Sequence, residues 1–152
     1  MINQFSTAIQ TIDSLHEEII AILESAGPEG WNWKPDFPDN NSLYSIANHT
    51  ILSQYWWIQE NLNQVKIQRD RPAEFTARAE TLDELKKLFY DVEALTKQVL
   101  EPIPESDLQE QRSVKGRSVT IEWIVMHVIE HTALHLGHMQ ITKQLLENQH
   151  KG

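Results

Sequence analysis

Histidine is concentrated in one stretch of the chain. Residues 123–140 read WIVMHVIEHTALHLGHMQ and hold four of the seven histidines, His127, His131, His135 and His138. At about 100° per residue on a helical wheel, these four fall within an arc of about 80°. Imidazole nitrogens commonly bind zinc and other divalent metals, and a buried imidazole must be hydrogen bonded or bound to something. The stretch therefore predicts a helix that carries a metal site.

Distance along this helix decides which histidines could share an ion. A helix rises about 1.5 Å per residue, so His127 and His135 lie about 12 Å apart and cannot hold one ion together. Neighbours one turn apart have Cβ atoms about 6 Å apart and can do so. The remaining pairs are His127 with His131, His131 with His135, and His135 with His138. Each pair supplies two ligands, and a third must come from another part of the chain.

The wheel also places the histidines relative to the core. Apolar side chains within about 40° of the histidine arc are those of Ile124, Val128, Leu134, Ile141 and Leu145, so we expect this face to be buried. A second apolar stripe of Val125, Ile129 and Leu136 lies on the opposite side. A monomeric bundle would leave that stripe exposed, which predicts a homodimer formed through helices.

His49 is the best candidate for the third ligand. It lies in a helix expected over residues 43–63, where Ile46, Ser53, Trp56, Trp57 and Glu60 fall within about 80° of it on the wheel. Apolar bulk mixed with polar atoms is typical of a pocket wall. Ser53, Trp56, Trp57 and Glu60 are therefore candidate pocket residues, and Glu60 would act as an acid or base only in a dry pocket. His16 occupies a core position of the first helix and is expected to be a packed, structural residue.

The remaining helices follow from apolar periodicity and from helix-ending residues. Long amphipathic helices are expected over residues 2–25 and 43–63, from a capping box at Thr81–Glu84 to Pro102, and from Ser118 or Thr120 to about Asn148. Loops over 26–42, 64–80 and 105–118 connect them, with Trp31, Trp33 and Phe37 folded over one bundle end. No strand is expected. These elements predict an all-α fold, a four-helix bundle with long connecting loops, in a single domain over residues 1–152.

Composition excludes several classes of protein. The chain has 152 residues and no cysteine, so disulfides, a thiolate metal site and a protein thiol nucleophile are excluded. Its net charge is −9, with 13 basic residues scattered among 22 acidic ones, which argues against a nucleic-acid partner. No apolar stretch approaches the length of about 20 residues that spans a membrane, and no secretory leader is visible. We expect a cytoplasmic protein that acts on a small molecule.

Two motifs resemble those of the DinB-like (YfiT-like) family of four-helix metalloproteins. One is the segment from Ser42 to His49, followed by Trp56 and Trp57; the other is His131-Thr-Ala-Leu-His135-Leu-Gly-His138. The resemblance covers nearly the whole chain in helix order and spacing. It implies a site of His49, His131 and His135 that holds zinc or nickel.

The chain departs from this family pattern at two positions. His138 stands where the family usually has Gln, and Leu136 stands where Arg is common. His138 could supply an extra ligand or hydrogen bond to a bound water, and His127, one turn earlier, is best interpreted as a neighbour of the site.

A site of three imidazoles allows two kinds of catalysis. The dication keeps its charge and an open position, so it acidifies a bound thiol or water. The resemblance implies the first kind, a transferase that uses a low-molecular-weight thiol such as bacillithiol or mycothiol against electrophiles. A hydrolase is the alternative, and so is a non-catalytic metal-binding or sensing protein in which His138 or His127 closes the site. Metal binding should weaken below about pH 6, where histidines protonate.

A protease is a weaker interpretation of the same helix. His127-Val-Ile-Glu130-His131 matches the H-x-x-E-H pattern of inverzincins, in which the glutamate is the general base. Glu130 lies about 60° from His127 on the side away from the other histidines. The chain is also short for a protease cleft, so we do not favour this interpretation.

Overall fold

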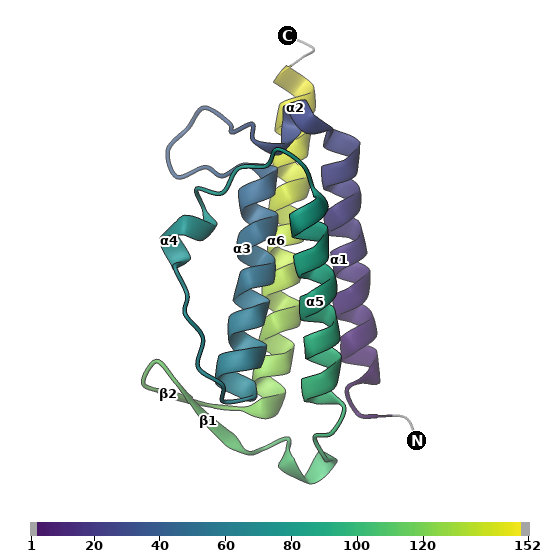
Figure 1. Cartoon of the computed structure of the whole chain (residues 1–152), viewed down its shortest axis with the longest axis vertical. Helices are drawn as coiled ribbons and strands as arrows, with labels where there is room; N and C mark the ends of the chain where they lie inside the picture. Colours follow the sequence, from purple (N-terminus) through teal and green to yellow (C-terminus); the bar gives the residue numbers. More distant parts are fainter. Residues whose placement is uncertain (1–2, 150–152) are drawn as a thin grey trace.

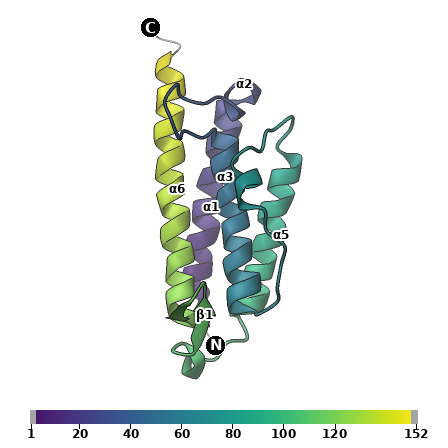
Figure 2. The ribbon, with the colours of Figure 1, turned by 90° about the vertical axis from the view of Figure 1, so that its left-hand side faces the viewer.

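Four long helices run side by side along the molecule (Figures 1 and 2). The computed structural model describes residues 3–149. The bundle consists of α1 (Ser6–Ala26), α3 (Leu43–Tyr55) with its π-helical continuation η1 (Trp56–Leu62), α5 (Asp83–Leu100) and α6 (Ile121–Gln149). The predicted all-α fold, a four-helix bundle with long connections, is confirmed.

The ends of the helices follow local chemistry. The hydroxyl of Ser42 accepts the amide of Ser45 at 3.0 Å at the start of α3, and that of Thr120 accepts the amide of Trp123 at 3.0 Å at the start of α6. Thr120, rather than Ser118, is therefore the cap of the last helix. The capping box expected at the start of α5 is not formed, because the helix begins one residue later and Thr81 accepts the amide of Asp83 at 3.4 Å.

The connections carry small elements of their own. The first contains the short helix α2 (Pro28–Trp31), the second contains α4 (Arg71–Glu74), and the third contains the 3-10 turn η2 (Glu105–Asp107). At the predicted bundle-end cap, the Trp31 indole donates to the carbonyl of Leu23 at 2.8 Å. Phe37, expected to pack there as well, is 53% exposed. Ile2, expected at the start of the first helix, lies outside the described residues.

A β-hairpin precedes α6, so the expectation of no strand is wrong. Strands β1 (Gln111–Val114) and β2 (Arg117–Thr120) pair antiparallel, with Val114 opposite Arg117. The turn between them is formed by Lys115 and Gly116, both with positive φ, which suits the right-handed twist of a two-residue hairpin. Each strand has only four residues, which is too short for alternation to stand out in the sequence.

The buried face of α6 differs from the predicted face by a rotation about the helix axis. It packs mainly against α1 and α3, and its buried face includes Val125 and Leu136 of the stripe that was expected to be exposed. Leu134, Ile141 and Leu145, which were expected in the core, are exposed instead. The histidines consequently lie at the edge of the buried face, facing α3.

The core has two clusters along the bundle. One includes Phe5, Ile12, Trp57 and Ile124 near the hairpin, and the other joins apolar residues of the opposite half, Ile19, Leu23, Leu43, Phe89 and Met139 among them. No helix of residues 3–149 has the length and apolar character needed to cross a membrane.

Candidate metal centre

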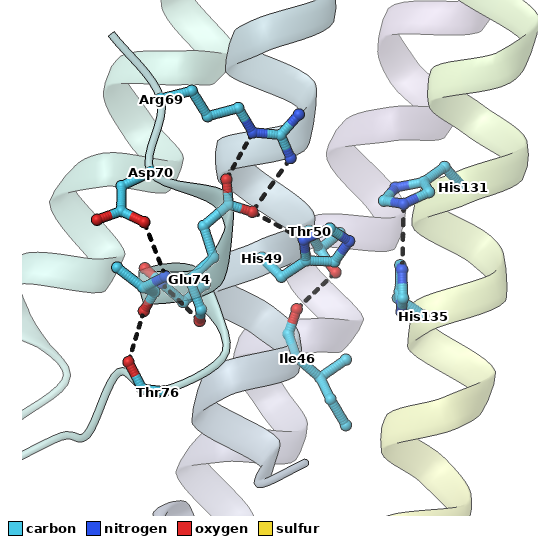
Figure 3. Close-up of polar contacts among 11 residues, drawn as sticks. Ile46, His49, Thr50, Arg69, Asp70, Glu74, Thr76, His131 and His135 are labelled. Carbon is cyan, nitrogen blue, oxygen red and sulfur yellow. Dashed lines mark hydrogen bonds and ion pairs between the residues drawn. The ribbon is translucent and has the colours of Figure 1, made fainter. Parts of the chain in front are cut away.

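The structure brings three of the predicted histidines together. His49 on α3 faces His131 and His135 on α6, with ring centroids 5.2 Å and 4.9 Å away (Figure 3). The Nε2 atoms of His131 and His135 are 3.1 Å apart. One nitrogen from each of the three rings lies within 4.8 Å of the others. His131 and His135 are the pair one helical turn apart, and His49 is the third member from another helix.

This geometry fits a divalent metal. Two imidazole nitrogens on one tetrahedral zinc ion, each about 2.05 Å from it, are about 3.3 Å apart, close to the separation of His131 and His135. The Nδ1 atom of His135 is buried and has no hydrogen-bond partner among the described residues. That nitrogen is separate from the Nε2 atom that faces His131, so an ion shared by the two Nε2 atoms would not contact it. Imidazole donors suit zinc, nickel, copper and iron, whereas magnesium and calcium prefer oxygen.

A buried carboxylate orients His49. Glu74, the last residue of α4, is 2% exposed, and its Oε2 atom lies 2.8 Å from His49 Nδ1 (Figure 3). Arg69 donates to the same carboxylate from Nε at 2.6 Å and from Nη2 at 3.1 Å. The paired charge makes His49 Nδ1 the donor and leaves Nε2 free for an ion, the arrangement in which a carboxylate fixes a metal-binding imidazole.

Periodicity in the sequence does not reveal Glu74, because it lies in a polar connection. One signal does mark its position: Asp70 followed by Arg-Pro-Ala is the pattern of a short helix start. Asp70 accepts the amide of Ala73 at 3.2 Å, and the single turn that results carries Glu74 toward α3.

Burial keeps these histidines neutral. It lowers the pKa of His131 to about 3, helped by the neighbouring His135 and His49. Burial also lowers the pKa of His135 to about 4, helped by the neighbouring His49 and His138. Burial also lowers the pKa of His49, although the hydrogen bond to Glu74 opposes it. Their lone pairs are available well below pH 7, so the weakening of metal binding expected near pH 6 moves to lower pH.

His127 and His138 fall outside the group of three. His127 stacks on Trp123 with ring centroids 4.8 Å apart and an interplanar angle of 7°, and its ring lies 5.9 Å from that of His131. Burial lowers its pKa. His138 is exposed, with its ring 6.1 Å from that of His135. Both are neighbours of the cluster, one at each end of it along α6.

The predicted pocket residues divide into two kinds. Ser53, Trp56 and Trp57 are buried, and Trp57 contacts His127 with ring centroids 4.8 Å apart. Glu60 instead accepts the backbone amide of Ile67 at 3.3 Å, which ties the start of the long connection to η1. Trp57 therefore borders His127, Trp56 packs against Trp57, and Glu60 has a structural contact.

The protease pattern finds no support in this arrangement. Glu130 is exposed, and His127, the first residue of the pattern, does not join the three-histidine group. A general base in that pattern has to face the ion.

His16 forms a separate polar cluster in the core. Its Nδ1 atom lies 2.8 Å from Glu93 and its Nε2 atom lies 2.9 Å from the amide oxygen of Gln54. Asp13, the third member of this group, pairs with Lys97 at 2.9 Å. Both ring nitrogens of His16 have protein partners, as a structural histidine requires.

The fold and the site together define a helical bundle with a three-histidine cluster between two helices. The chain belongs to the family described as mycothiol-S-transferase, whose model matches residues 9–148. The resemblance to DinB-like proteins is thereby confirmed.

Two solved structures share this fold. A conserved protein from Enterococcus faecalis superposes with a TM-score of 0.82 at 19% identity, covering 97% of this chain and 99% of its own. A DinB-like protein from Bacillus subtilis has a TM-score of 0.68 at 15% identity and covers 93% of each chain. At such identities these likenesses show the fold alone. None of the curated proteins compared with the chain matches it.

Proposed function

We propose that this protein is a metal-dependent S-transferase that joins a low-molecular-weight thiol to a small electrophile. The observation that carries the proposal is the convergence of three neutral imidazoles, His49, His131 and His135, from two helices. A zinc or nickel ion bound there would keep its full charge and an open position, and would thereby lower the pKa of a bound thiol. Because the chain has no cysteine, that thiol must be a separate molecule.

The chain's own residues would hold and shape this site. Glu74, neutralised by Arg69, keeps Nε2 of His49 directed at the site. Trp57 contacts His127, and Trp56 packs on Trp57, so these two buried rings exclude water beside His127. His127 and His138 are polar neighbours at the two ends of the histidine row, where they can hydrogen bond to a substrate.

Two alternatives are less well supported. A hydrolase would use the same ligands to activate water, but membership of a thiol S-transferase family favours the thiol. A closed, non-catalytic site needs a fourth protein ligand. Within residues 3–149, the histidine group contains three residues, and neither His127 nor His138 belongs to it.

Metal content is the first test. Protein purified without a nickel column should contain about one zinc or nickel ion per chain by mass spectrometry, and His49→Ala and His131→Ala should both lose it. The matched control is His16→Ala, which removes a histidine with two protein partners. The loaded protein should then conjugate a small thiol to an electrophile such as a chlorodinitrobenzene. If the wild-type protein takes up neither zinc nor nickel, the proposed metal-dependent enzyme is refuted.

We also propose that two copies pair through α6. Of the eight exposed large apolar residues in the described chain, five lie on this helix: Trp123, Met126, Leu134, Ile141 and Leu145. They fall within an arc of about 100° on one side of the helix. The predicted homodimer is retained, but on this stripe rather than on that of Val125, Ile129 and Leu136.

A further inference from the structure

One long connection covers the side of His49 that faces away from α6. Residues 64–80, which we call the strap, lie between η1 and α5, contain α4 and run along the outside of α3 (Figures 1 and 2). The strap supplies Glu74, which bonds to Nδ1 of His49. It also supplies Phe75, whose ring stacks on that of His49 with centroids 4.4 Å apart. The strap therefore holds the His49 ring in its orientation toward α6.

Little apolar surface attaches the strap to the bundle. Among residues 64–80, all of which the structure describes, only Glu74 is buried. The strap reaches the apolar core through Ile67, Ala77 and Ala79, which lie at the edges of the two clusters. A hollow of about 300 Å³ remains between the strap and α3. A segment with so few buried apolar contacts opens locally at a lower free energy than the whole fold.

Hydrogen bonds hold the first half of the strap. The backbone amide of Ile67 donates to Glu60 at 3.3 Å where the strap leaves η1. Further along, the side chain of Asn48 donates to the backbone carbonyl of Glu74 at 3.2 Å. Asn48 and His49 are adjacent on α3, so both grip the same residue of the strap.

The far end of the strap is held from α2. Oδ1 of Asn32, the residue after α2, accepts the backbone amide of Ala79 at 2.8 Å, and Nδ2 of Asn32 donates to the carbonyl of Ala79 at 2.8 Å. This side-chain amide thus pairs with both backbone groups of one strap residue, as a neighbouring β-strand would. The hydroxyl of Ser45 adds a bond to the carbonyl of Ala77 at 3.0 Å. These bonds fix the strap just beyond Glu74 and Phe75.

The three histidines differ in how their side chains are held. His131 and His135 belong to one continuous helix, α6. The ring of His49, by contrast, is fixed by Glu74 and Phe75 of the strap. Opening of the strap removes both contacts together and frees this ring to change its orientation. The open form is therefore the one in which His49 can release an ion or take one up.

We propose that the strap is a gate for metal exchange and that the bonds between Asn32 and Ala79 set how often it opens. This inference rests on the metal site of the proposed function and adds how an ion enters and leaves it. Uptake and release pass through the same open form, so weaker bonds speed both by the same factor and leave the affinity unchanged. Loss of the Glu74 carboxylate differs, because it weakens the bound state itself.

The experiment follows zinc on two variants of the full-length protein. Asn32→Ala removes both bonds to Ala79, whereas Asn32→Asp keeps the acceptor and loses the donor. Zinc release is timed by stopped flow into excess chelator, uptake is timed with a fluorescent zinc indicator, and affinity is measured by competition between the two. Trypsin cleavage after Lys66 and Arg78, which are exposed, reports opening of the metal-free strap independently of zinc.

The matched control is Asn40→Ala. Asn40 lies in the same connection as Asn32, but its side chain bonds to the carbonyls of Pro35 and Phe37 rather than to the strap. Loss of these bonds should leave zinc exchange and cleavage of the strap as in wild type.

Zinc uptake and release should each be about tenfold faster in Asn32→Ala and about threefold faster in Asn32→Asp, with dissociation constants within about twofold of wild type. Cleavage of the strap should accelerate in the same order. Unchanged exchange rates in Asn32→Ala, or faster release with an equal loss of affinity, would overturn the gate and leave the proposed function standing. A wild-type protein that binds no zinc or nickel would overturn the proposed function, and this inference with it.

Discussion

At the scale of single residues, the site depends on a contact between two distant segments. His49 is held by Glu74, a residue 25 positions further along the chain. Arg69 donates two hydrogen bonds to the Glu74 carboxylate, and its positive charge offsets the cost of burying that carboxylate. An isolated buried carboxylate would instead take up a proton and become neutral. The direction of one metal-binding imidazole is therefore set by a single helical turn in a polar connection.

Replacing that carboxylate should weaken the site without removing a ligand. Glu74→Gln keeps the size of the side chain but loses the charge that orients His49, so zinc affinity should fall about 10- to 100-fold. Competition with a chromogenic chelator measures this loss. Glu80→Gln, an exposed acid in the same connection, should bind zinc as wild type does. Equal affinity in Glu74→Gln and wild type would show that the contact does not support the metal.

The lowered pKa values predict how acid affects the metal-free protein. Histidines of the unfolded chain protonate near pH 6.5, whereas folded His131 and His135 do so at about 3 and 4. Between these pH values the unfolded chain binds more protons than the folded chain. The contribution of these two histidines to the free energy of unfolding is therefore complete above pH 6.5 and declines as the pH falls toward 4. Urea unfolding of chelator-treated protein at several pH values should show this decline.

Variants separate this effect from general acid unfolding. His131→Gln/His135→Gln removes both groups and should flatten the decline between pH 6.5 and 4. His138→Gln, an exposed histidine of the same helix, should leave the decline as steep as in wild type. An identical slope in all three proteins would mean that the buried pair does not control acid stability.

At the scale of elements, periodicity was sufficient to locate the helices but not to orient the last one. The amphipathic helix expected over residues 2–25 is present as α1, and its apolar residues Ile9, Ile12 and Ile19 are buried. In α6, apolar residues occur on almost every side, so no single face stands out in the sequence. Contacts with α1 and α3 determine which face of α6 is buried. The residues that make these contacts are more than 60 positions from α6 in the sequence.

The elements that escaped prediction share a physical cause. The hairpin, the π-helical segment η1 and the turn of α4 are short, and each depends on contacts from elsewhere in the molecule rather than on a local repeat. Spacing on a long helix left three pairs of histidines open, and it was the resemblance to the DinB-like family that selected His131 and His135 together with His49, the three that lie together. The carboxylate that orients His49 could not be predicted, because it lies on one of these short elements.

The cap of α6 gives a test at this scale. Both Ser118 and Thr120 could cap this helix by sequence, but it is the hydroxyl of Thr120 that accepts the amide of Trp123. Thr120→Ala should therefore lower the free energy of unfolding by about 1 kcal/mol. Ser118→Ala loses an exposed contact with Gln111 and should change it by less than about 0.5 kcal/mol. Urea unfolding measures both, and the reverse order would contradict the assignment.

At the scale of the whole molecule, the histidine row and the exposed apolar stripe lie on neighbouring sides of α6. The stripe places five exposed apolar residues on one side of a single helix from Trp123 to Leu145, with the exposed Glu130 between Met126 and Leu134. A second copy placed on it would lie beside the row that contains His127 and His138. Dimer formation would therefore have two effects at once. It would cover the apolar stripe, and it would narrow the opening through which a ligand reaches the candidate metal centre.

A second charge in the middle of this stripe should weaken pairing. Leu134 is 68% exposed, and a lysine in its place would have to be desolvated between two helices together with Glu130, which lies one turn earlier on the same side of the helix. Leu134→Lys should raise the dissociation constant of the dimer by at least about tenfold, as sedimentation velocity over a concentration series would show. Tyr90→Lys, at a position on α5 that is 70% exposed, should leave association unchanged. A wild-type protein that remains monomeric at the highest concentration, or a Tyr90→Lys variant that loses association as well, would mean that copies do not pair through α6.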